Sequence, residues 1–285
     1  EVVFVDGQQL LPTSFGAFNP VTNIWEPIAY AGTYGTNGFR LDFADSSALG
    51  NDVSGNDNDF TVNNLTSVDQ ASDTCSNNFA TMNPLQAEIG ATTLSEGNTK
   101  LVTTGGSGTS GNTVCTFGVS SGKWYWEAKL TTNPATTAHC VSVVGEDFQV
   151  SASDVYLTAN NSASISYITF ATNSGNAVTN FTGTRSSSSY GSAPSTNDIV
   201  GVALDLDNGK IFFSVNGTWQ NSGDPETGTN PASSSVGSLK GDFVFPAFGD
   251  ENYSTSASFL VNFSNPAFSI SSGNADANGH GNFEY

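Results

Sequence analysis

The feature that constrains this chain most is a long hairpin pattern between residues 197 and 217. Apolar side chains recur at every second position on both sides of the turn sequence Asp207-Asn208-Gly209, at Val200, Val202, Leu204, Leu206, Ile211, Phe213 and Val215. A period of two is typical of strands that bury one face, and Asp, Asn and Gly favour tight turns. The pattern therefore predicts two antiparallel strands joined at residues 207–209.

Residues 122–130 predict another half-buried strand. Trp124, Trp126, Ala128 and Leu130 share one face, and Lys123, Tyr125, Glu127 and Lys129 share the other. We expect both tryptophans in the core and the second set in solvent. Further short runs occur at 141–145, 165–171, 243–248 and 259–263, separated by Gly, Asn and Ser and with no helical pattern between them. The sequence therefore predicts an all-β, antiparallel β-sandwich.

The composition limits the partners of such a fold. With 285 residues, 37% of them apolar and 11% aromatic, the chain is long and apolar enough to build a core. Seven Lys and Arg face 26 Asp and Glu, which gives a net charge of -19. Without a cationic stripe to neutralise phosphates, nucleic acids and anionic membrane surfaces are poor partners. No run approaches the ~20 consecutive apolar residues of a membrane helix, so membrane insertion is not expected.

The residues offer little for catalysis or metal binding. Cys75, Cys115 and Cys140 form no CxxC pair and are interpreted as buried free thiols. His139 is expected to open a strand and His280 lies in a Gly-rich segment, so no Ser-His-Asp triad is expected. Spacing cannot decide whether paired carboxylates converge for glycoside cleavage, because their separation depends on the fold. Glu127, Glu146, Asp147, Asp205 and Asp207 are interpreted as solvated strand or turn residues. We expect no enzyme activity and no cofactor.

An acidic run between residues 42 and 59 leaves one metal alternative open. It contains Asp42, Asp45, Asp52, Asp57 and Asp59, whose oxygens are of the kind that Ca²⁺ prefers. The spacing does not match the twelve-residue calcium loop, and Asp and Asn are also common in turns. We interpret the run as solvated turns, with structural calcium as the alternative.

Composition divides the chain into four zones. Residues 1–36, with scattered aromatics and prolines, predict an extended, irregular N-terminal arm, and residues 37–112 are expected to add strands or loops to the sandwich. Residues 113–265 carry the strand pattern, and residues 266–285 predict the start of a C-terminal extension. The first residue is Glu and the last segment ends on aromatics, so we expect a fragment of a longer polypeptide.

Three aromatic residues stand outside the alternating runs, within polar loops. They are Tyr190, Trp219 and Tyr253, and Arg185 lies just before the serine run that leads to Tyr190. Exposed aromatics surrounded by hydroxyl and amide groups are typical of surfaces that stack on sugars or on partner side chains. We interpret these four residues as candidate ligand-binding residues at one edge of the sandwich. The alternative is that each aromatic only covers the sandwich from outside.

Several segments together resemble the SPRY domain. They are Gly122-Lys123-Trp124-Tyr125-Trp126-Glu127, the hairpin from Asp198 to Gly217, Phe245-Pro246-Ala247 and Val261-Asn262-Phe263, and the resemblance covers residues 113–265. Upstream, residues 34–39, 41–47 and 54–60 are similar to the segment that precedes such domains in tail-fibre and other virion proteins of marine bacteriophages. The upstream stretch is also similar to the opening strand of laminin-G-like sandwiches.

The resemblance implies a bent sandwich that binds through its edge loops and is not an enzyme. In the phage setting it implies a fibre or spike subunit of the virion, displayed as a homotrimer toward the host, with a bacterial surface glycan or outer-membrane protein as its partner. Two alternatives stay open. One is a structural capsid or tail decoration that contacts other virion proteins, and the other is a polysaccharide depolymerase.

Overall fold

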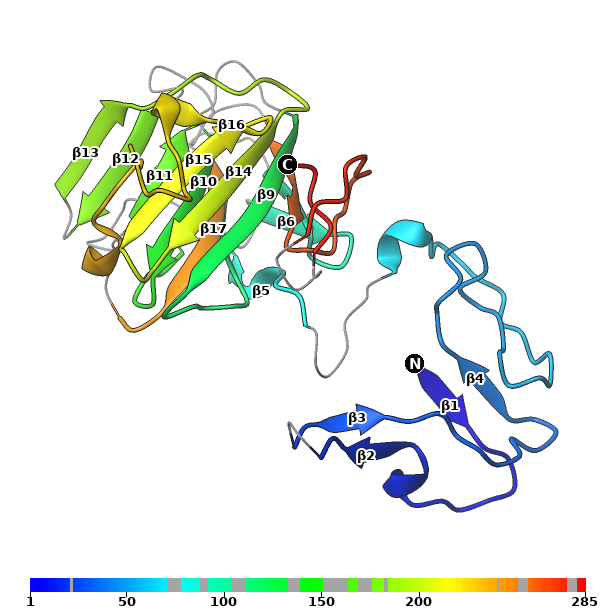
Figure 1. The fold of residues 1–285 in the computed structure, drawn as a ribbon. Coiled ribbons are helices and arrows are strands. Elements are labelled where there is room, and N and C mark those ends of the chain that lie inside the picture. Colours follow the sequence, from blue (N-terminus) through cyan, green and yellow to red (C-terminus); the bar gives the residue numbers. More distant parts are fainter. Residues whose placement is uncertain are drawn as a thin grey trace. The chain divides into compact units, whose positions relative to one another are not determined.

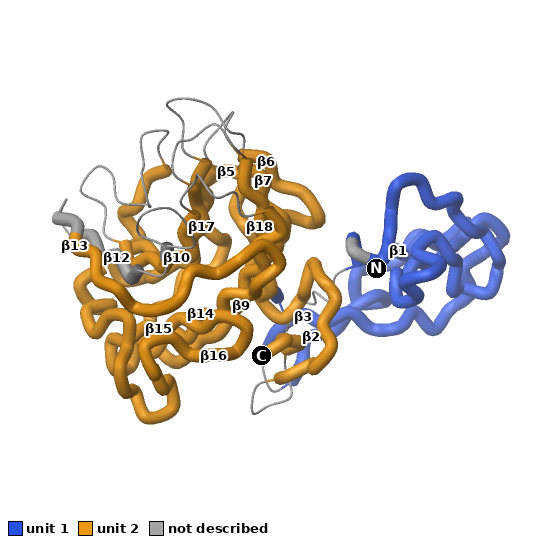
Figure 2. The backbone as a smooth tube through the Cα atoms, turned by 90° about the horizontal axis from the view of Figure 1, so that it is seen from above, with its two compact units in different colours: residues 1–79 blue, residues 80–285 orange. Residues whose placement is uncertain are grey.

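The computed structural model describes residues 1–20, 23–70, 78–87, 92–103, 111–132, 139–150, 164–168, 176–181, 184–239, 241–250, 256–275 and 281–285. The chain divides into two compact units, residues 1–79 and residues 80–285 (Figure 2). The larger unit carries most of the strands (Figure 1).

The unit of residues 80–285 is built from two antiparallel sheets. Here the first is called the β10 sheet, and its strands in spatial order are β13 (Thr184–Ser189), β12 (Asn176–Phe181), β11 (Ser164–Ile168), β10 (His139–Gly145), β17 (Val244–Asp250), β8 (Asn112–Cys115) and β5 (Met82–Ala87). The second, the β9 sheet, has the order β16 (Thr218–Trp219), β15 (Lys210–Val215), β14 (Ile199–Asp205), β9 (Lys123–Thr132), β18 (Ser258–Asn262), β7 (Lys100–Thr103) and β6 (Thr92–Ser95). Short 3-10 turns η4 (Gln220–Ser222) and η5 (Val236–Ser238) follow β16.

The predicted hairpin is confirmed. β14 pairs with β15 in antiparallel register, with Asp205 opposite Lys210, and Gly209 in the turn has a φ of 65°. A positive φ of this kind costs a glycine little, because it has no Cβ to clash. β14 also pairs with β9, which confirms the strand predicted at residues 122–130. The all-β, antiparallel sandwich is therefore as the sequence predicted.

A single large core lies between the two sheets. It contains inward residues of both, among them Trp126, Leu130, Val143, Phe213 and Phe259. The prediction for Trp124 is wrong, because its side chain is 47% exposed. Lys123, the neighbour of Trp124, pairs with the last residue of β14, so Trp124 stands at the rim of the sheet. Its indole N–H donates to the main-chain oxygen of Ser121 in the preceding loop, at 2.8 Å.

Part of the segment 37–112, which was expected to add strands or loops to the sandwich, contributes strands to both of its sheets. β5 pairs with β8, and β6 and β7 join the β9 sheet through β18. The structure thus separates the chain after residue 79, whereas the composition placed boundaries after residues 36 and 112. Composition missed this division because residues 80–112 resemble the preceding residues in their polar character while their backbone pairs with distant strands.

The unit of residues 1–79 consists of short strand pairs and turns. β1 (Val2–Phe4) pairs with β4 (Phe39–Leu41), and β2 (Gly16–Phe18) pairs with β3 (Trp25–Pro27). Two 3-10 turns, η1 (Pro12–Ser14) and η2 (Ser67–Asp69), complete it. In its described part, the buried large hydrophobic residues are Leu41 and Leu49, so this unit has little core of its own.

The acidic run folds into a network of turns around Asp52. Each oxygen of this buried carboxylate accepts two hydrogen bonds. Oδ1 accepts from the main-chain N–H groups of Arg40 and Ser54, and Oδ2 accepts from the Asn58 N–H and the Ser54 hydroxyl. Burial alone would raise the pKa of Asp52, but these hydrogen bonds lower it to about 2. A carboxylate whose four lone-pair sites already accept hydrogen bonds has few lone pairs left to coordinate a cation. Asp52 is thus a buried turn residue, whereas the sequence placed it in solvent.

A buried polar pair lies near one end of the core. His139, which opens β10 as predicted, stands opposite Asp250 of β17. Burial lowers the pKa of His139 to about 3. Burial also raises the pKa of Asp250 to about 6, although hydrogen bonds from Thr103 and Gly111 act against it. The two residues therefore respond to acid in opposite ways.

Replacing Asp250 by asparagine is expected to make the sandwich more sensitive to acid. Between about pH 4 and 6 folded Asp250 keeps a proton that the unfolded chain has lost, so its contribution to stability falls as pH rises. His139 contributes in the opposite sense, because the unfolded chain binds the proton that the folded chain excludes. In Asp250→Asn only the His139 contribution remains, and the free energy of unfolding should fall by about 1.4 kcal/mol more per pH unit on acidification than in the parent.

Urea unfolding followed by circular dichroism across this pH range measures the slope. His139→Gln serves as the matched variant, since it should change the slope in the opposite direction. Equal slopes in the parent and both variants would show that neither group titrates as described.

Cys115 and Cys140 are buried and form no disulfide, as predicted, and burial raises the pKa of the Cys115 thiol. Cys75 and His280 lie outside the described residues. In the described part of the chain, no helix has the length and apolar character needed to span a bilayer.

Candidate functional site

The four candidate residues from the sequence do not form one exposed edge. Tyr253 lies outside the described residues, and for Arg185 the structure describes the backbone in β13, opposite Asn180. Tyr190 is 6% exposed and belongs to the core. Trp219 in β16 is half-buried and packs edge-on against Tyr125 of the same chain, with ring centroids 6.3 Å apart.

The prediction that Tyr190 is an exposed loop residue is therefore wrong. Its ring lies edge-on to Tyr167 and Phe213, with centroids 6.3 Å and 6.4 Å away. Its hydroxyl donates to the main-chain oxygen of Asn230 at 3.3 Å, so the polar end also has a partner. Burial raises the pKa of Tyr190 to about 12. The polar residues around Tyr190 concealed a core residue, because the chain turns inward there after the serine-rich strand β13.

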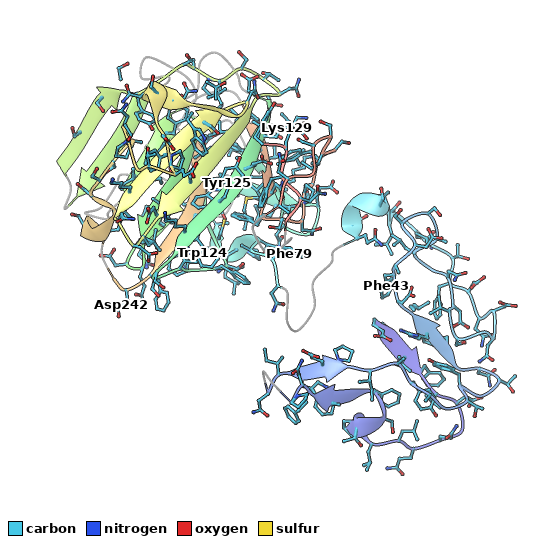
Figure 3. All side chains as sticks on the ribbon, in the orientation of Figure 1. Phe43, Phe79, Trp124, Tyr125, Lys129 and Asp242 are labelled. Carbon is cyan, nitrogen blue, oxygen red and sulfur yellow. The ribbon has the colours of Figure 1, made fainter. Side chains whose placement is uncertain are left out.

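Three exposed aromatic side chains lie instead at one end of the sandwich, at the other end of β15 from Trp219. β9 and β17 begin at this end and β8, β10 and β14 finish there, as their pairings require. Phe117, Trp124 and Phe243 are 41%, 47% and 42% exposed. We call these three residues the apolar end. Figure 3 labels Trp124 and Asp242 at this end of the sandwich.

One loop fixes the apolar end to both sheets. In residues 116–122, Val119 exchanges main-chain hydrogen bonds of 2.9 Å with Val244 at the start of β17. In the same loop, the main-chain oxygen of Gly122 accepts from Leu206, beyond β14. Gly118 lies so close to Phe245 that a Cβ there would stand 2.5 Å from the ring. Phe117 is therefore held on a loop that is attached to both sheets, whereas Trp124 lies in β9 and Phe243 directly precedes β17.

A cavity of about 180 Å³ opens beside Phe245 at the same end of the β10 sheet. Val114, Phe148 and Phe245 provide apolar walls, and Asn83, Gln86 and Glu146 provide polar groups. Phe148 and Val114 belong to a second, smaller hydrophobic cluster. A cavity of this size, lined by both apolar and polar groups, has room for one inserted side chain.

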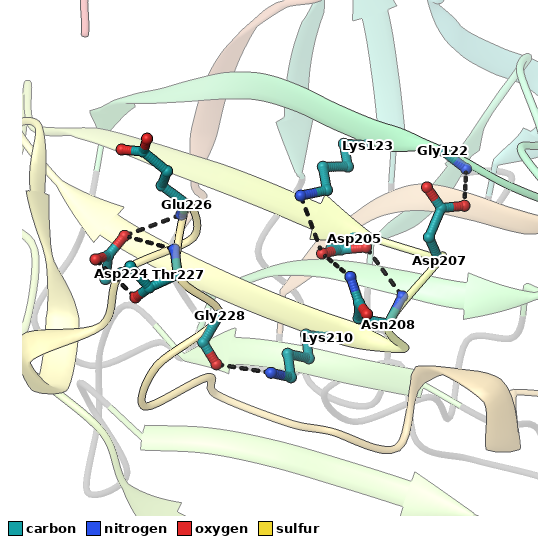
Figure 4. Close-up of polar contacts among 10 residues, drawn as sticks. All are labelled: Gly122, Lys123, Asp205, Asp207, Asn208, Lys210, Asp224, Glu226, Thr227 and Gly228. Carbon is teal, nitrogen blue, oxygen red and sulfur yellow. Dashed lines mark hydrogen bonds and ion pairs between the residues drawn. The ribbon is translucent and has the colours of Figure 1, made fainter.

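Carboxylates surround the apolar end. Glu146, Asp147, Asp207 and Asp242 are exposed there. Asp207 accepts from the Gly122 N–H at 2.8 Å, and Glu146 accepts from the Asp242 N–H at 3.0 Å (Figure 4 shows the Asp207 contact). The two carboxylates thus order the loops that carry the aromatic residues.

Asp205, at the end of β14, is buried and closes the hairpin turn. It accepts two hydrogen bonds from Asn208, and Lys123 lies 3.6 Å away (Figure 4). Burial opposes the charged form of Asp205, but the Asn208 hydrogen bonds and the Lys123 charge outweigh it and lower its pKa. Asp205 is a turn residue, as the sequence indicated, but it is buried, whereas the sequence placed it in solvent.

Glu127 contradicts its sequence interpretation more strongly. It lies in the middle of β9, was expected in solvent, and has no exposed surface. Both carboxylate oxygens accept hydrogen bonds from within the chain. The burial of Glu127 comes from the last segment of the chain, and the sequence signal that could have revealed it is the pair of aromatic residues there, Phe283 and Tyr285. Within the described residues, no group of three His, Cys, Asp or Glu side chains is arranged to hold a metal ion.

Comparison with known proteins identifies the sandwich. Residues 123–254 match the family model of the SPRY domain. Among solved structures, the chain is similar to the SPRY domain of human HERC1, with a TM-score of 0.46 and 19% identity over 63% of this chain and 96% of that one. It is similar to the PSpry domain of TRIM65, with a TM-score of 0.43 and 13% identity over 65% of this chain and 90% of that one. It is also similar to a human SPRY domain, with a TM-score of 0.40 and 18% identity over 60% of this chain and 94% of that one.

No curated protein matches the chain. The family match falls on the strands that the sequence singled out, including β9, β14 and β15. The second unit of this chain therefore contains a SPRY domain, at residues 123–254.

Proposed function

We propose that this chain is a non-enzymatic binding module that holds a protein partner at the apolar end of its SPRY domain. The observation that carries the proposal is that Phe117, Trp124 and Phe243 are all exposed at one end of the sandwich, with Phe117 on a loop that is hydrogen-bonded to both sheets. Aromatic side chains next to a small cavity are the usual energetic centre of a protein interface.

The charge around this centre indicates the kind of partner. Exposed carboxylates of Glu146, Asp147, Asp207 and Asp242 lie at this end, within a chain of net charge -19. A partner surface with an apolar centre and a basic rim would be attracted and oriented by this charge. We therefore favour a protein over a neutral glycan.

The biological setting is the finer part of the proposal. It rests on the resemblance of residues 34–60 to the segment that precedes SPRY domains in virion proteins of marine bacteriophages. On this basis the chain is a subunit of a virion fibre or tail appendage, and the partner is an outer-membrane protein of the host. Three linked copies would strengthen a weak single-site contact by about 10²- to 10⁴-fold without new contacts.

A cell-binding experiment tests this function. Labelled chain is added to a panel of marine bacterial isolates, beside the variant Phe117→Ser, Trp124→Ser, Phe243→Ser. We expect saturable binding by the parent to susceptible isolates and binding by the variant weaker by at least about 100-fold, since that factor corresponds to about 2.7 kcal/mol and a single aromatic anchor at an interface centre contributes on the order of 2 kcal/mol. Protease treatment of the cells should abolish binding, whereas periodate treatment should not.

The matched control replaces three exposed residues at the other end of β14 and β15, in the variant Ser195→Ala, Thr196→Ala, Thr218→Ala. It should bind like the parent. Equal loss in both variants, or failure of the folded parent to bind any isolate, would contradict the proposal. Binding that periodate abolishes would assign a glycan partner instead.

A second candidate function, structural assembly within the virion, is favoured by the unit of residues 1–79. In its described part, eleven large hydrophobic side chains are exposed, among them Phe4, Leu11, Phe18, Trp25 and Phe60. A unit with so little core of its own is typical of a segment that is covered in an assembly. A second or third copy of this chain is the partner that the expected homotrimer would supply.

Self-association of the chain should therefore increase with salt. Each chain carries a charge of -19, so copies repel at low ionic strength, and salt screens this repulsion while leaving apolar contacts intact. Sedimentation velocity at about 0.01 M and 0.15 M NaCl is expected to show a shift from monomer toward a discrete oligomer. The change Phe18→Ser, Phe60→Ser should suppress the oligomer, and a monomer at both salt concentrations would contradict the assembly role.

A further inference from the structure

The outer face of the β9 sheet is occupied by the chain's own last residues. Residues 281–285, here called the C-terminal strap, return to this face, and the C end lies beside β9 in Figure 1. Phe283 is buried there, edge-on to Tyr125 of β9 with ring centroids 5.0 Å apart. The strap is therefore docked on the sheet by side-chain packing as well as by hydrogen bonds.

Glu127 lies at the centre of this contact. Its Oε1 accepts from the main-chain N–H of Tyr285 at 2.9 Å, and its Oε2 accepts from the main-chain N–H of Glu284 at 3.1 Å. On the sheet side, the Tyr125 hydroxyl and the Asn262 amide donate to the same carboxylate, each at 3.1 Å. The sheet thus holds the carboxylate in place and presents both oxygens to the strap.

The strap meets this carboxylate as an anion-binding turn. Successive N–H groups of an extended strand point in opposite directions, so two consecutive amides can reach one carboxylate only where the chain turns. Concave turns of this kind bind anions through their main-chain N–H groups. Asn262 also donates to the main-chain oxygen of Asn282 at 2.8 Å, which fixes the register of the turn on the sheet.

Two aromatic side chains add to the main-chain recognition. Phe283 packs on Tyr125, and the ring of Tyr285 lies over Gly217, in the turn between β15 and β16. A Cβ at Gly217 would stand 2.5 Å from the Tyr285 ring, so the absence of a side chain there makes room for it. The face therefore has one place for each ring, at Tyr125 for Phe283 and at Gly217 for Tyr285.

The contacts that shape the strap are separate from those that hold it. Ser271 and Ser272 hydrogen-bond to Glu284, and Asn274 exchanges main-chain hydrogen bonds of 2.8 Å with Phe283. These contacts all lie within residues 271–285, whereas the receiving groups are on β9, on β18 and in the β15–β16 turn. Residues 282–285 are thus bonded to residues 271–274 through one set of groups and to the sheet through another.

From these observations we propose that Tyr125, Glu127, Asn262 and Gly217 form a peptide-binding site for a turn with two free main-chain N–H groups and an aromatic side chain on each side of an acidic residue. Residues 282–285 fill this site in cis, and the same segment from a second copy can fill it in trans when the resident strap leaves. The site is distinct from the apolar end and does not depend on the function proposed there.

A synthetic peptide of residues 271–285 tests the proposal with the full chain. The variant Phe283→Ala, Tyr285→Ala loosens the resident strap but leaves the receiving residues intact. Fluorescence anisotropy should show saturable binding of the labelled peptide to this variant, and binding to the unchanged chain should be at least about tenfold weaker, because its own strap competes.

Two peptide controls keep the outcome decisive without altering the fold of the protein. A peptide N-methylated at the amides of Glu284 and Tyr285 lacks both donors, and we expect its binding to be at least about tenfold weaker. A scrambled peptide should not bind. Equal binding by the N-methylated peptide, equal binding to the unchanged chain, or no binding to a variant that still unfolds cooperatively would each overturn the proposal.

Discussion

The variant Tyr190→Ala is expected to lower the free energy of unfolding of the sandwich by about 3 kcal/mol. Removing this ring leaves a cavity beside Tyr167 and Phe213 and also removes the hydroxyl that donates to Asn230. A loss of this size should lower the melting temperature of a unit as large as residues 80–285 by about 6–12 °C. Thermal and urea unfolding followed by circular dichroism measure both quantities.

Tyr190→Phe is the matched control, because it keeps the ring and removes only one hydrogen bond. It should cost about 1 kcal/mol. Trp124→Ala, at an exposed aromatic position, should change stability far less than Tyr190→Ala does. If Tyr190→Ala unfolded like the parent, the ring would lie in solvent, as the sequence had predicted, and the assignment of Tyr190 to the core would fail.

The variant Glu127→Ala is expected to cost a similar amount, about 3 kcal/mol. The reason differs, since this change removes the acceptor of four hydrogen bonds and leaves their partly or fully buried donors without it. Donors to a charged acceptor contribute more than neutral pairs, and orphaned buried donors are costly. Hydrogen exchange at the amides of Glu284 and Tyr285 should accelerate along with the loss of stability.

Glu226→Ala controls for the loss of one negative charge, because Glu226 is exposed in a turn (Figure 4). It should change stability by no more than about 0.5 kcal/mol. Unchanged exchange at the two strap amides in Glu127→Ala would contradict the docking of the strap on Glu127, whatever the stability of the variant.

The fold could be predicted from sequence where its signals are local. The hairpin of β14 and β15 carries both the apolar alternation and the turn residues that fix its register, so strands, turn and inward faces follow directly. The same alternation predicts Trp126 correctly but fails for Trp124, two residues earlier on the same face. Periodicity reports the face of a strand and does not report where the opposing sheet ends.

The candidate site was harder to predict, because exposure depends on segments far apart in the sequence. Tyr190 follows a run of serines, and only the packing of Tyr167 and Phe213 against it shows that the chain enters the core. Glu127 alternates onto the outer face, and only residues 281–285, more than 150 positions later, cover it. The aromatic residues Phe117 and Phe243 gave no signal alone, since their clustering requires the pairing of Val119 with Val244.

Position-specific photo-crosslinking on cells tests the binding of a partner at the apolar end most directly. A benzophenone amino acid replaces Phe243 in one preparation and Thr196, which is exposed before the start of β14 and thus at the other end of that strand, in another. If the partner sits on the apolar end, irradiation of the cell-bound chain will attach a bacterial surface protein to position 243 and none to position 196. Crosslinking that is equal at both positions, or that occurs from position 196 alone, would contradict this account of the SPRY domain.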